Sequence, residues 1–524
     1  MNLGTIIARN ARLYPDKIGV VDSEARRRFT WQEFNCRVNQ LAHALLAAGL
    51  RHGDRVAIYS RNGHQCLELF FACAKTGMIA QPLNWRYTPA EIVATLEEGA
   101  PAGILVSVEF AATYQAIKKQ LPFITVTVGL NGREGFDEEY EKFMAAHSSA
   151  EPATLDAVSD NEVLFLFNTG GTTGVAKSIA MTHLNALSVG LNISLAVSIR
   201  DSDCYLIIGP MFHASITTVL SFVLCGAQIV VMNFEPRRTL EVIQREKVTS
   251  FLAIATILNY LIEAAGANTF DTSNLRLIIY GGAPISLATL QRAMKTFRHT
   301  DFLQALAQSE SGVISLLLPE EHRRAFATDN FRLLRSCGRG AMLSEVRLIN
   351  DNDQNVPKDG KSLGEVIVRG YGVMRGYWNK PDLTAETLRN GWCHTGDIAS
   401  WDAEGFIYVV DRKKDMIISG GENIYSAIVE EAIYKHPAVK ECAVIGVPDK
   451  VYGETIKAVV VLHEGCAARA EEIIAICKQH LAGYMKPASV DFVNELPKTP
   501  AGKILKRMLR ERYWAGEERR VGGV

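Results

Sequence analysis

One stretch, residues 163–178, constrains the fold and function of this chain more than any other part of the sequence. Residues 163–167 are all apolar and predict a buried strand. Residues 169–174 are all glycine or threonine, so the backbone there can turn sharply and bring several N–H groups close to one anion. Lys177 adds a positive charge that suits a phosphate group. Because a buried strand precedes the loop and a lysine follows it, we interpret it as a polyphosphate-binding loop rather than an ordinary surface turn.

The loop matches the motif of P-loop nucleotide-binding proteins with one exception. Residues 171–178 follow the pattern G-x-x-x-x-G-K-[ST], but Ala176 replaces the glycine before the lysine. A P-loop phosphotransferase, which would release ADP, therefore stays an alternative. The early glycines and the threonine pair fit a different nucleotide-binding pattern better.

The composition indicates an ordinary globular protein of more than one domain. A chain of 524 residues exceeds what one hydrophobic core usually holds. The formal net charge of −1 gives no electrostatic reason to expect nucleic acid as a partner. None of the ten cysteines lies at C-x-x-C spacing, so we expect free thiols in a reducing, cytoplasmic compartment. Arg9 and Arg12 interrupt any signal-peptide core, and we expect no transmembrane segment.

Strand-like and helix-like segments alternate along most of the sequence, which predicts an α/β fold with a mostly parallel sheet covered by helices. The strand-like segments are residues 18–21, 55–59, 103–108, 123–128, 204–208, 228–231, 250–254 and 275–280. Beyond residue 415 the pattern changes to that of a small α+β domain. Its segments are helices near 427–435 and 470–482 and strands near 439–447 and 456–462.

Six motifs together resemble the adenylate-forming, or AMP-binding, superfamily of the acyl-CoA synthetase type. They are T-G-G-T-T-G-V-A-K at 169–177, Y-G-G-A-P at 280–284, W-C-H-T-G-D at 392–397, D-R-K-K-D at 411–415, S-G-G-E-N-I at 419–424 and K-T-P-A-G-K at 498–503. They occur in the family's order over nearly the whole chain. The resemblance implies a large N-terminal domain of layered sheets and helices, residues 1–413, and a small mobile α+β C-terminal domain, residues 414–524.

The resemblance also implies two half-reactions in one site. A carboxylate attacks the α-phosphate of ATP to give an acyl-adenylate and pyrophosphate, and the thiol of coenzyme A then displaces AMP to give a thioester. We therefore expect ATP, Mg²⁺ and coenzyme A as cofactors or co-substrates. The first step concentrates negative charge on phosphate oxygens, so it needs donors and cations that are in place beforehand.

By the same resemblance, most of the predicted site residues bind ATP or AMP. The residues expected at the phosphates and at the adenine are Thr169, Gly170, Gly171, Thr172, Thr173, Gly174, Lys177, Gly281, Gly282, Ala283, Leu306 and Ser309. Asp397 is expected to accept hydrogen bonds from both ribose hydroxyls, and Arg412 to add a ribose contact. Glu310 is the expected magnesium residue, since a hard cation beside phosphates prefers oxygen ligands.

The resemblance implies catalytic roles for two residues. Lys503 is expected to bridge the carboxylate and the α-phosphate during adenylation. His213 is expected to be a gate near the reacting carboxylate, with a role in positioning rather than as a general base. Lys414 is the expected hinge of the C-terminal domain.

The remaining predicted site residues concern coenzyme A. Gly420 and Gly421 would leave room for the pantetheine arm to pass close to the backbone. A tight hairpin turn would need the same glycines. Arg86 and Lys486 are expected to contact the 3′-phosphate, and ordinary surface charge is an equal alternative for both.

The sequence departs from the family pattern most clearly at residues 306–310, where L-A-Q-S-E replaces the usual Y-G-x-T-E. Leu306 offers apolar contact where a tyrosine normally stacks on adenine. The segments that would form the wall of the acid pocket are residues 211–215, 233–234, 280–282 and 305–314. They are mainly apolar or small, which predicts an aryl acid or a medium- to long-chain acyl substrate.

The favoured function is therefore an ATP-dependent carboxylate–CoA ligase. An adenylating enzyme that loads a carrier protein shares every motif except the need for a coenzyme A channel, and it stays open. A nonenzymatic acyl-adenylate sensor is less consistent with the retention of Asp397 and Lys503. A homodimer is compatible with the sequence, which does not fix the oligomeric state.

Overall fold

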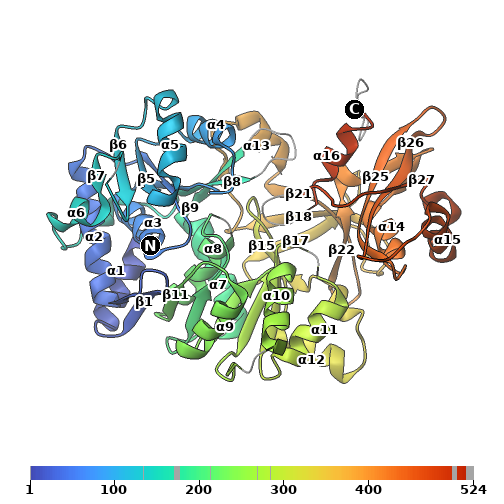
Figure 1. The fold of residues 1–524 in the computed structure, drawn as a ribbon, viewed down its shortest axis with the longest axis horizontal. Helices are drawn as coiled ribbons and strands as arrows, with labels where there is room; N and C mark the ends of the chain where they lie inside the picture. Colours follow the sequence, from blue (N-terminus) through green and yellow to red (C-terminus); the bar gives the residue numbers. More distant parts are fainter. Residues whose placement is uncertain are drawn as a thin grey trace. The chain divides into compact units, whose positions relative to one another are not determined.

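The computed structural model describes residues 2–133, 135–169, 177–212, 214–267, 270–283, 285–498 and 504–514, with the side chains of residues 169 and 267 excepted (Figure 1). The described chain forms two compact units. The first comprises Met1–Val346 and Val368–Cys393, and the second Arg347–Ile367 and His394–Val524. This division describes compactness rather than motion, so the mobile domain predicted to begin after residue 413 stays a prediction. The predicted mixed α/β class, with a large N-terminal and a smaller C-terminal part, is confirmed.

A nine-stranded sheet of the first unit has parallel strands at its centre and antiparallel strands at its edges. The parallel pairs follow from the alternation of strands and helices along the chain. In order across the sheet the strands are β16 (Arg339–Gly340), β15 (Gly312–Leu317), β14 (Asp301–Gln308), β13 (Leu277–Gly281), β12 (Ser250–Ala253), β10 (Cys204–Ile207), β11 (Gln228–Val231), β1 (Ile18–Asp22) and β2 (Arg27–Thr30).

An eight-stranded sheet of the same unit contains the predicted phosphate strand. In order its strands are β19 (Gly376–Tyr377), β9 (Lys177–Thr182), β8 (Val163–Thr169), β4 (Ile79–Pro82), β3 (Arg55–Tyr59), β5 (Gly103–Ser107), β6 (Val126–Leu130) and β7 (Glu138–Glu139). Residues 164–168 of β8 are buried, in line with the predicted buried strand, and β8 pairs antiparallel with β9. The two strands form a hairpin whose connecting loop is the glycine- and threonine-rich segment.

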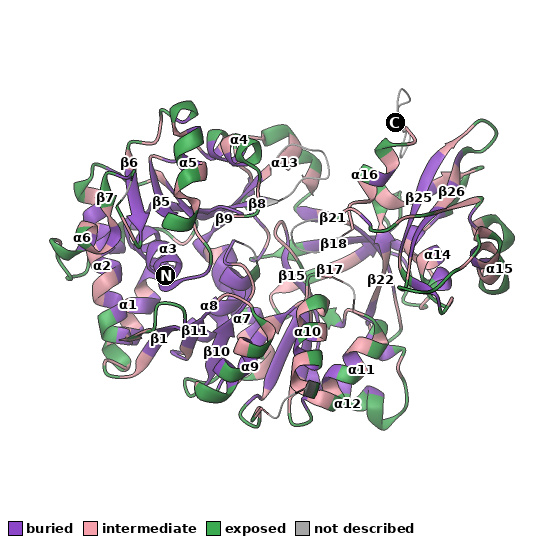
Figure 2. Cartoon of the chain, in the orientation of Figure 1, coloured by how far each residue is buried: buried purple, intermediate pink, exposed green. Residues whose placement is uncertain are grey.

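Helices cover the strands of the first unit (Figure 1). They are α1 (Leu3–Leu13), α2 (Trp31–Ala47), α3 (His64–Thr76), α4 (Pro89–Gly99), α5 (Ala111–Ile117), α6 (Tyr140–Ala145), α7 (His183–Val197), α8 (Ala214–Leu224), α9 (Pro236–Arg245), α10 (Ala255–Ala267), α11 (Leu287–Thr296), α12 (Pro319–Ala327) and α13 (Pro381–Thr387). Capping boxes begin α2 and α4: Thr30 with Glu33, and Thr88 with Glu91. Every residue of α3 is buried, and Figure 2 shows most strands of this unit as buried too.

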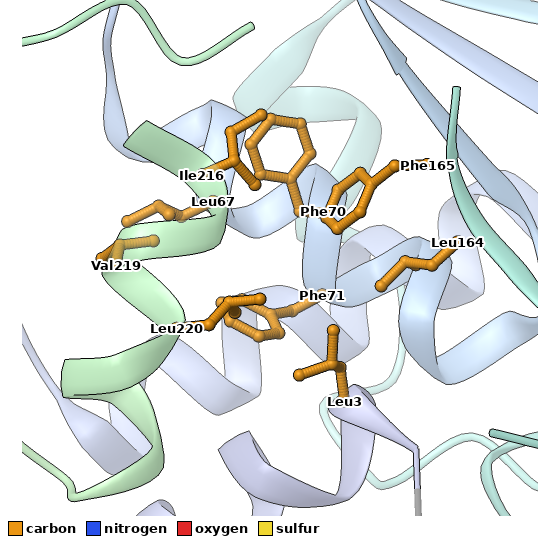
Figure 3. Close-up of a pocket in the computed structure, with 9 residues that line it drawn as sticks. All are labelled: Leu3, Leu67, Phe70, Phe71, Leu164, Phe165, Ile216, Val219 and Leu220. Carbon is orange, nitrogen blue, oxygen red and sulfur yellow. The ribbon is translucent and has the colours of Figure 1, made fainter. Parts of the chain in front are cut away.

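A small cavity lies in the core between α1, α3, β8 and α8 (Figure 3). Its lining is wholly apolar: Leu3, Leu67, Phe70, Phe71, Leu164, Phe165, Ile216, Val219 and Leu220. The cavity has a volume of about 10 Å³, and its lining residues present no polar atom to it. We regard it as a packing void, since even one water molecule needs both room and polar partners.

The second unit is built mainly from two smaller sheets. The first has the order β17 (Ser344–Ile349), β18 (Gly364–Gly370), β21 (Trp392–Trp401), β20 (Leu388–Arg389), with β22 (Ile407–Arg412) paired to β21. The chain passes between the units inside β17, β18 and β21. The other has the order β24 (Glu422–Ile424), β23 (Ile417–Ser419), β26 (Gly453–Leu462), β25 (Val439–Asp449), with β27 (Ser489–Phe492) on β26. Helices α14 (Ser426–Ile433), α15 (Ala470–His480) and α16 (Lys506–Glu511) complete the α+β pattern.

Candidate active site

The base of the phosphate hairpin is fixed by buried polar contacts. Asn168 and Ser178 lie directly opposite each other, and Thr169 pairs with Lys177. The hydroxyl of Ser178 is completely buried, 2.7 Å from Oε2 of Glu98 and 2.8 Å from Oδ1 of Asn168. The loop itself, with the predicted ligands Gly170, Gly171, Thr172, Thr173 and Gly174 and the side chain of Thr169, lies outside the described residues.

The position of Ser178 argues against a P-loop phosphotransferase. In a P-loop, the hydroxyl that follows the lysine binds Mg²⁺ beside the phosphates. Here that hydroxyl is buried behind the hairpin and bound to a carboxylate. The match of residues 171–178 to the P-loop pattern therefore does not extend to the geometry.

Lys177 and Glu310, two predicted ATP-site residues, lie beside the same side chain. The hydroxyl of Tyr377 donates a hydrogen bond of 3.0 Å to Oε1 of Glu310. The Nζ atom of Lys177 lies 5.7 Å from the centre of the Tyr377 ring. Burial, together with the Glu310 carboxylate beside it, raises the pKa of Tyr377, so the hydroxyl keeps its proton and donates. The sequence reasoning missed Tyr377, which lies 67 residues from Glu310.

The described residues fit one carboxylate ligand of a magnesium ion rather than a complete protein cage. Among them no three histidine, cysteine or acidic side chains cluster closely enough to hold a metal ion. Magnesium bound with a nucleotide typically takes one or two carboxylates together with substrate phosphates. Glu310, with one oxygen oriented by Tyr377, fits that donor set.

The predicted adenine turn follows β13 and explains both of its glycines. A Cβ atom on Gly281 would lie 2.3 Å from the carbonyl oxygen of Ala305 on the neighbouring strand. Gly282 has φ +75°, in the left-handed region that favours glycine. Leu306 is half-buried and comes directly after Ala305, so the structure brings the turn and Leu306 onto adjoining strands, as the predicted pocket requires.

A buried tyrosine supports this turn from the core. The hydroxyl of Tyr280 lies 2.8 Å from Nε2 of His322, whose Nδ1 lies 2.8 Å from the carbonyl oxygen of Leu318. Burial lowers the pKa of His322 to about 4, so the ring is neutral at pH 7. Nδ1–H therefore donates to Leu318, and Nε2 accepts from Tyr280. Residues 280–282 are one of the predicted wall segments of the acid pocket, and in this segment the side chain of Tyr280 is directed into the core.

The predicted gate residue, His213, lies outside the described residues, but the segment just before it is held by well-defined hydrogen bonds. Asn62 accepts a hydrogen bond of 3.0 Å from the backbone N–H of Met211. Its Nδ2 donates to the carbonyl oxygens of Gly209, at 2.9 Å, and Met232, at 3.0 Å. One buried amide therefore fixes the segment before His213. Asn62 belongs to no motif, so no pattern in the sequence identifies it.

In the second unit, the two predicted ribose residues face each other across β21 and β22. Asp397 and Arg412 are cross-strand partners, and Nε of Arg412 lies 2.6 Å from Oδ1 of Asp397. The Asp397 side chain is only 4% exposed. Ser309, predicted at the adenine, lies in the first unit in the turn between β14 and β15 and is half-buried.

Glu365, which the sequence did not single out, supports the part of β21 just before Asp397. Its Oε1 accepts a hydrogen bond of 3.2 Å from the N–H of Gly396, and its Oε2 lies 3.2 Å from Nζ of Lys413. Burial alone would raise its pKa, but the hydrogen bond from His394 and the charge of Lys413 lower the pKa of Glu365 to about 2. Glu365 is therefore charged at neutral pH.

The predicted hinge residue, Lys414, lies in a short 3₁₀ turn, Lys413–Asp415, that is tied to elements on both sides. Asp411 accepts a hydrogen bond of 2.7 Å from the hydroxyl of Ser426. Asp415 forms an ion pair of 2.8 Å with Arg510 of α16. The predicted catalytic Lys503 lies outside the described residues, between Lys498 and Ile504, which form an antiparallel bridge.

The predicted coenzyme A residues are divided between the units. Gly420 and Gly421 have φ +60° and +86° and form the turn between β23 and β24. Two successive positive φ angles are typical of a type I′ hairpin turn, so local geometry alone requires both glycines. The guanidinium of Arg86 lies 4.4 Å from the ring centre of Trp85 in the first unit, whereas Lys486 lies in the second. Their common contact with one phosphate stays a prediction.

Comparison with known proteins identifies the family. Residues 7–378 match the model of the AMP-binding enzyme family, and residues 428–503 match that of the AMP-binding enzyme C-terminal domain. The chain belongs to this family. It is an enzyme of the adenylate-forming superfamily, of the acyl-CoA synthetase type, as the six motifs predicted.

Individual relatives cover nearly the whole chain. Feruloyl-CoA synthase of Amycolatopsis sp is 34% identical over 98% of this chain and 99% of its own length. Long-chain-fatty-acid–CoA ligase FadD13 of Mycobacterium tuberculosis is 34% identical with the same coverage. Fatty acid–[acyl-carrier-protein] ligase ScoC of Streptomyces coeruleorubidus is 30% identical over 94% of this chain and 93% of its own. The crystal structure of ATP-bound MatB from Rhodopseudomonas palustris superposes with a TM-score of 0.86 at 26% identity, covering 98% and 99% of the two chains.

These findings confirm the predicted activity class, ATP-dependent ligation of a carboxylate to coenzyme A, and its co-substrates ATP and coenzyme A. No helix in the described ranges is both long and apolar enough to cross a bilayer.

Proposed function

We propose that the chain is an ATP-dependent carboxylate–CoA ligase for an apolar acid, either an aryl acid or a medium- to long-chain fatty acid. The observation that carries the proposal is the arrangement at the end of the β8–β9 hairpin. There Lys177 and the Glu310 carboxylate lie beside Tyr377, next to the loop that has the family's phosphate motif. The pairing of an aryl-acid relative with a fatty-acid relative at equal identity supports both acid classes.

In the first half-reaction, the loop backbone and Lys177 would bind the β- and γ-phosphates. Glu310 would hold a magnesium ion, which when bound supplies positive charge that offsets the phosphate oxygens. The turn at Gly281 and Gly282 would receive the adenine against Leu306, and Asp397 with Arg412 would contact the ribose. Glu310 and Asp397 are each held by a local partner, Tyr377 and Arg412, before substrate binds. Preorganised groups of this kind are the usual main source of such catalysis.

Lys503 would provide the charge needed as the carboxylate attacks the α-phosphate. Lys503→Ala should therefore lower adenylation by roughly 100- to 1,000-fold, the scale of losing one preorganised donor. Thioester formation from supplied acyl-adenylate should be largely spared. An equal loss in both half-reactions would contradict this role.

In the second half-reaction, the Gly420–Gly421 turn would line the route of the pantetheine arm, and Arg86 and Lys486 would contact the 3′-phosphate. Lys414 would be the hinge about which residues 414–524 rotate between the half-reactions, because few backbone dihedrals suffice for such a motion. His213 would position the reacting carboxylate at the mouth of its pocket.

The proposal is tested by measuring pyrophosphate release over a panel of carboxylic acids, with AMP and acyl-CoA identified by mass spectrometry. We expect release with aryl or medium- to long-chain acids, in step with AMP and acyl-CoA formation. Release of ADP, or no dependence on any acid, would overturn it.

Loading of a carrier protein is the second candidate, because ScoC, an acyl-carrier-protein ligase by name, is 30% identical over most of the chain. The two candidates differ in the acceptor of the acyl group. Incubation with the best acid, ATP and either coenzyme A or a purified acyl carrier protein distinguishes them, since only the true acceptor gives a thioester at a rate that matches pyrophosphate release.

A cytoplasmic location and a homodimer belong to the same proposal. Ten free cysteines in the full sequence, without C-x-x-C spacing, support a reducing compartment. Fractionation of the native host and light scattering of the purified protein test the two points separately.

A further inference from the structure

Two parts of the proposed ATP site meet at one short turn of the first unit, Tyr377–Lys380. The N–H of Lys380 donates to the carbonyl oxygen of Tyr377 at 3.2 Å. The hydroxyl oxygen of Thr384, in α13, accepts from the N–H of Tyr377 at 2.9 Å and lies 2.8 Å from the carbonyl oxygen of Lys380. Both ends of the turn are therefore fixed to the start of α13.

The first end of the turn orients Glu310. The hydroxyl of Tyr377 donates to Oε1 of Glu310, and the backbone N–H of Met374 donates to the carbonyl oxygen of Glu310 at 2.8 Å. Tyr377 is also the strand partner of Ile179 in β9. The carboxylate of Glu310, the proposed magnesium ligand, is thus linked through Tyr377 to β9, the strand that begins at Lys177.

The other end of the turn holds the base of the phosphate hairpin. Nζ of Lys380 forms an ion pair of 2.5 Å with Oε1 of Glu98, whose side chain is 12% exposed. Oε2 of the same carboxylate contacts the hydroxyl of Ser178, which in turn contacts Asn168. These last two residues are the ones that immediately flank the Thr169–Lys177 pair.

The number of available protons decides which group donates and which accepts in these contacts. Ser178 has one hydroxyl proton, and because the Glu98 carboxylate only accepts, that proton is donated to Glu98. The Ser178 oxygen must then accept from Asn168, which turns the Nδ2 of Asn168 toward it. This orientation gives a partner to an Nδ2 group that is buried and otherwise has no hydrogen-bond partner within the described structure. The hydrogen bonds therefore run from Asn168 to Ser178 to Glu98, whose other oxygen forms the ion pair with Lys380.

We propose that the Tyr377–Lys380 turn is a positioning element that holds the metal carboxylate and the base of the phosphate hairpin in one fixed arrangement. The proposal rests on the ATP-dependent activity proposed above. Tyr377, Lys380, Glu98 and Ser178 act through Glu310 and the hairpin, so they are positioning residues. A bound ion and nucleotide then meet ligands whose geometry is already set, which is how a supporting set of contacts raises affinity.

The first test is Tyr377→Phe, which removes the hydroxyl but keeps the ring beside Lys177. With no acid present, ATP binding is titrated calorimetrically over a range of Mg²⁺ concentrations. We expect the Mg²⁺ concentration for half-maximal ATP binding to rise roughly three- to tenfold, the scale of one lost hydrogen bond. Excess Mg²⁺ should restore native ATP affinity.

Tyr140→Phe is the matched control. Tyr140 is buried and its hydroxyl donates to Oε2 of Glu68 at 2.6 Å, a bond of the same kind outside the proposed site. This variant should lower the melting temperature and leave the Mg²⁺ requirement unchanged. An equal shift of the Mg²⁺ requirement in both variants would show a general structural effect and overturn the proposal.

A double-mutant cycle tests whether the turn acts as one unit. Lys380→Met removes the ion pair with Glu98 and should lower ATP affinity by a similar three- to tenfold. If one turn transmits both effects, the ATP affinity of the double variant Tyr377→Phe/Lys380→Met should fall by clearly less than the product of the two single fold-losses. Multiplicative losses would mean two independent contacts and would overturn the single-element claim. A native protein that binds no ATP with Mg²⁺ would overturn the proposed function, and this inference with it.

Discussion

Two carboxylates have predicted roles in binding ATP, Glu310 in the first unit and Asp397 in the second, and their surroundings differ in charge. The carboxylate of Glu310 accepts a hydrogen bond from the neutral hydroxyl of Tyr377. Asp397 is paired with the guanidinium of Arg412 at 2.6 Å. A neutral donor orients a carboxylate without offsetting its charge, whereas a guanidinium offsets it. The first environment suits a cation, and the second suits an uncharged ligand such as the ribose hydroxyls.

The contrast extends to the neighbouring residues. Around Asp397 the supporting carboxylate, Glu365, lies beside the cation Lys413, and its pKa falls to about 2. Near Glu310 the support is a turn that reaches the hairpin through hydroxyl and amide groups and through an ion pair of Lys380 with Glu98. The different surroundings thus suit the two predicted roles, because the environment of a carboxylate decides what it can do.

The largest effect is expected from Glu310→Gln. The glutamine oxygen can still accept from Tyr377, so the change removes charge with little change in shape. Pyrophosphate exchange should fall roughly 100-fold or more, because charge stabilisation near the phosphates is lost. Mg²⁺ should no longer strengthen ATP binding, as measured by calorimetry. Glu241→Gln, at an exposed ion pair on α9, is the control and should leave both measurements unchanged.

Asp397→Asn tests the other side of the comparison. The amide oxygen can still contact Arg412 and one ribose hydroxyl, but the charged acceptor is gone. ATP affinity should fall about tenfold, since a hydrogen bond to a charged acceptor is stronger than one to a neutral acceptor by about that factor. The Mg²⁺ requirement should stay at its native value. Loss of the Mg²⁺ effect on ATP binding, as expected for Glu310→Gln, would remove the distinction between the two carboxylates.

The sequence predicted those parts of the site that lie within one motif. The buried strand before the loop and the glycine pair at 281–282 follow from local patterns. The motifs predict Asp397 and Arg412 at the ribose, but only the structure shows that the two residues pair with each other. Tyr377 and Glu365 act on residues 67 and 31 positions away in the chain, so no spacing rule identifies them. Only the pairing of strands in the sheets brings them to those residues. In the same way, the alternation of strands and helices predicts the α/β class but does not specify the order of the strands within each sheet.

Glu365 gives a prediction about pH. Its pKa in the folded protein, about 2, is below the usual value of 4.5, so the charged carboxylate stabilises the fold above about pH 4.5, and this contribution is lost as the pH falls toward 2. Glu365→Gln should lower the free energy of unfolding by roughly 1–3 kcal/mol at pH 7. The difference in the free energy of unfolding between the native protein and the variant should narrow as the pH falls from 5 to 3. Urea midpoints at several pH values measure it, and a gap that stays constant down to pH 3 would contradict the assigned charge pairing.

The smallest effect is expected at Leu306, which lies in the first unit beside the adenine turn. If Leu306 faces the adenine as predicted, leucine would bury apolar surface against one face of the base but would forfeit aromatic stacking, which is worth about 0.5–1.5 kcal/mol beyond area burial. At roughly 1.4 kcal/mol per tenfold, Leu306→Tyr should tighten ATP binding by at most about one order of magnitude. Tyr280 is directed into the core toward His322, so it would not compete with the new ring. The gain should be the same at low and high Mg²⁺, because the change acts on the base and not on the phosphates. Calorimetric titration of ATP into both forms decides the point, and weaker binding by the tyrosine variant would mean that residue 306 does not face the adenine.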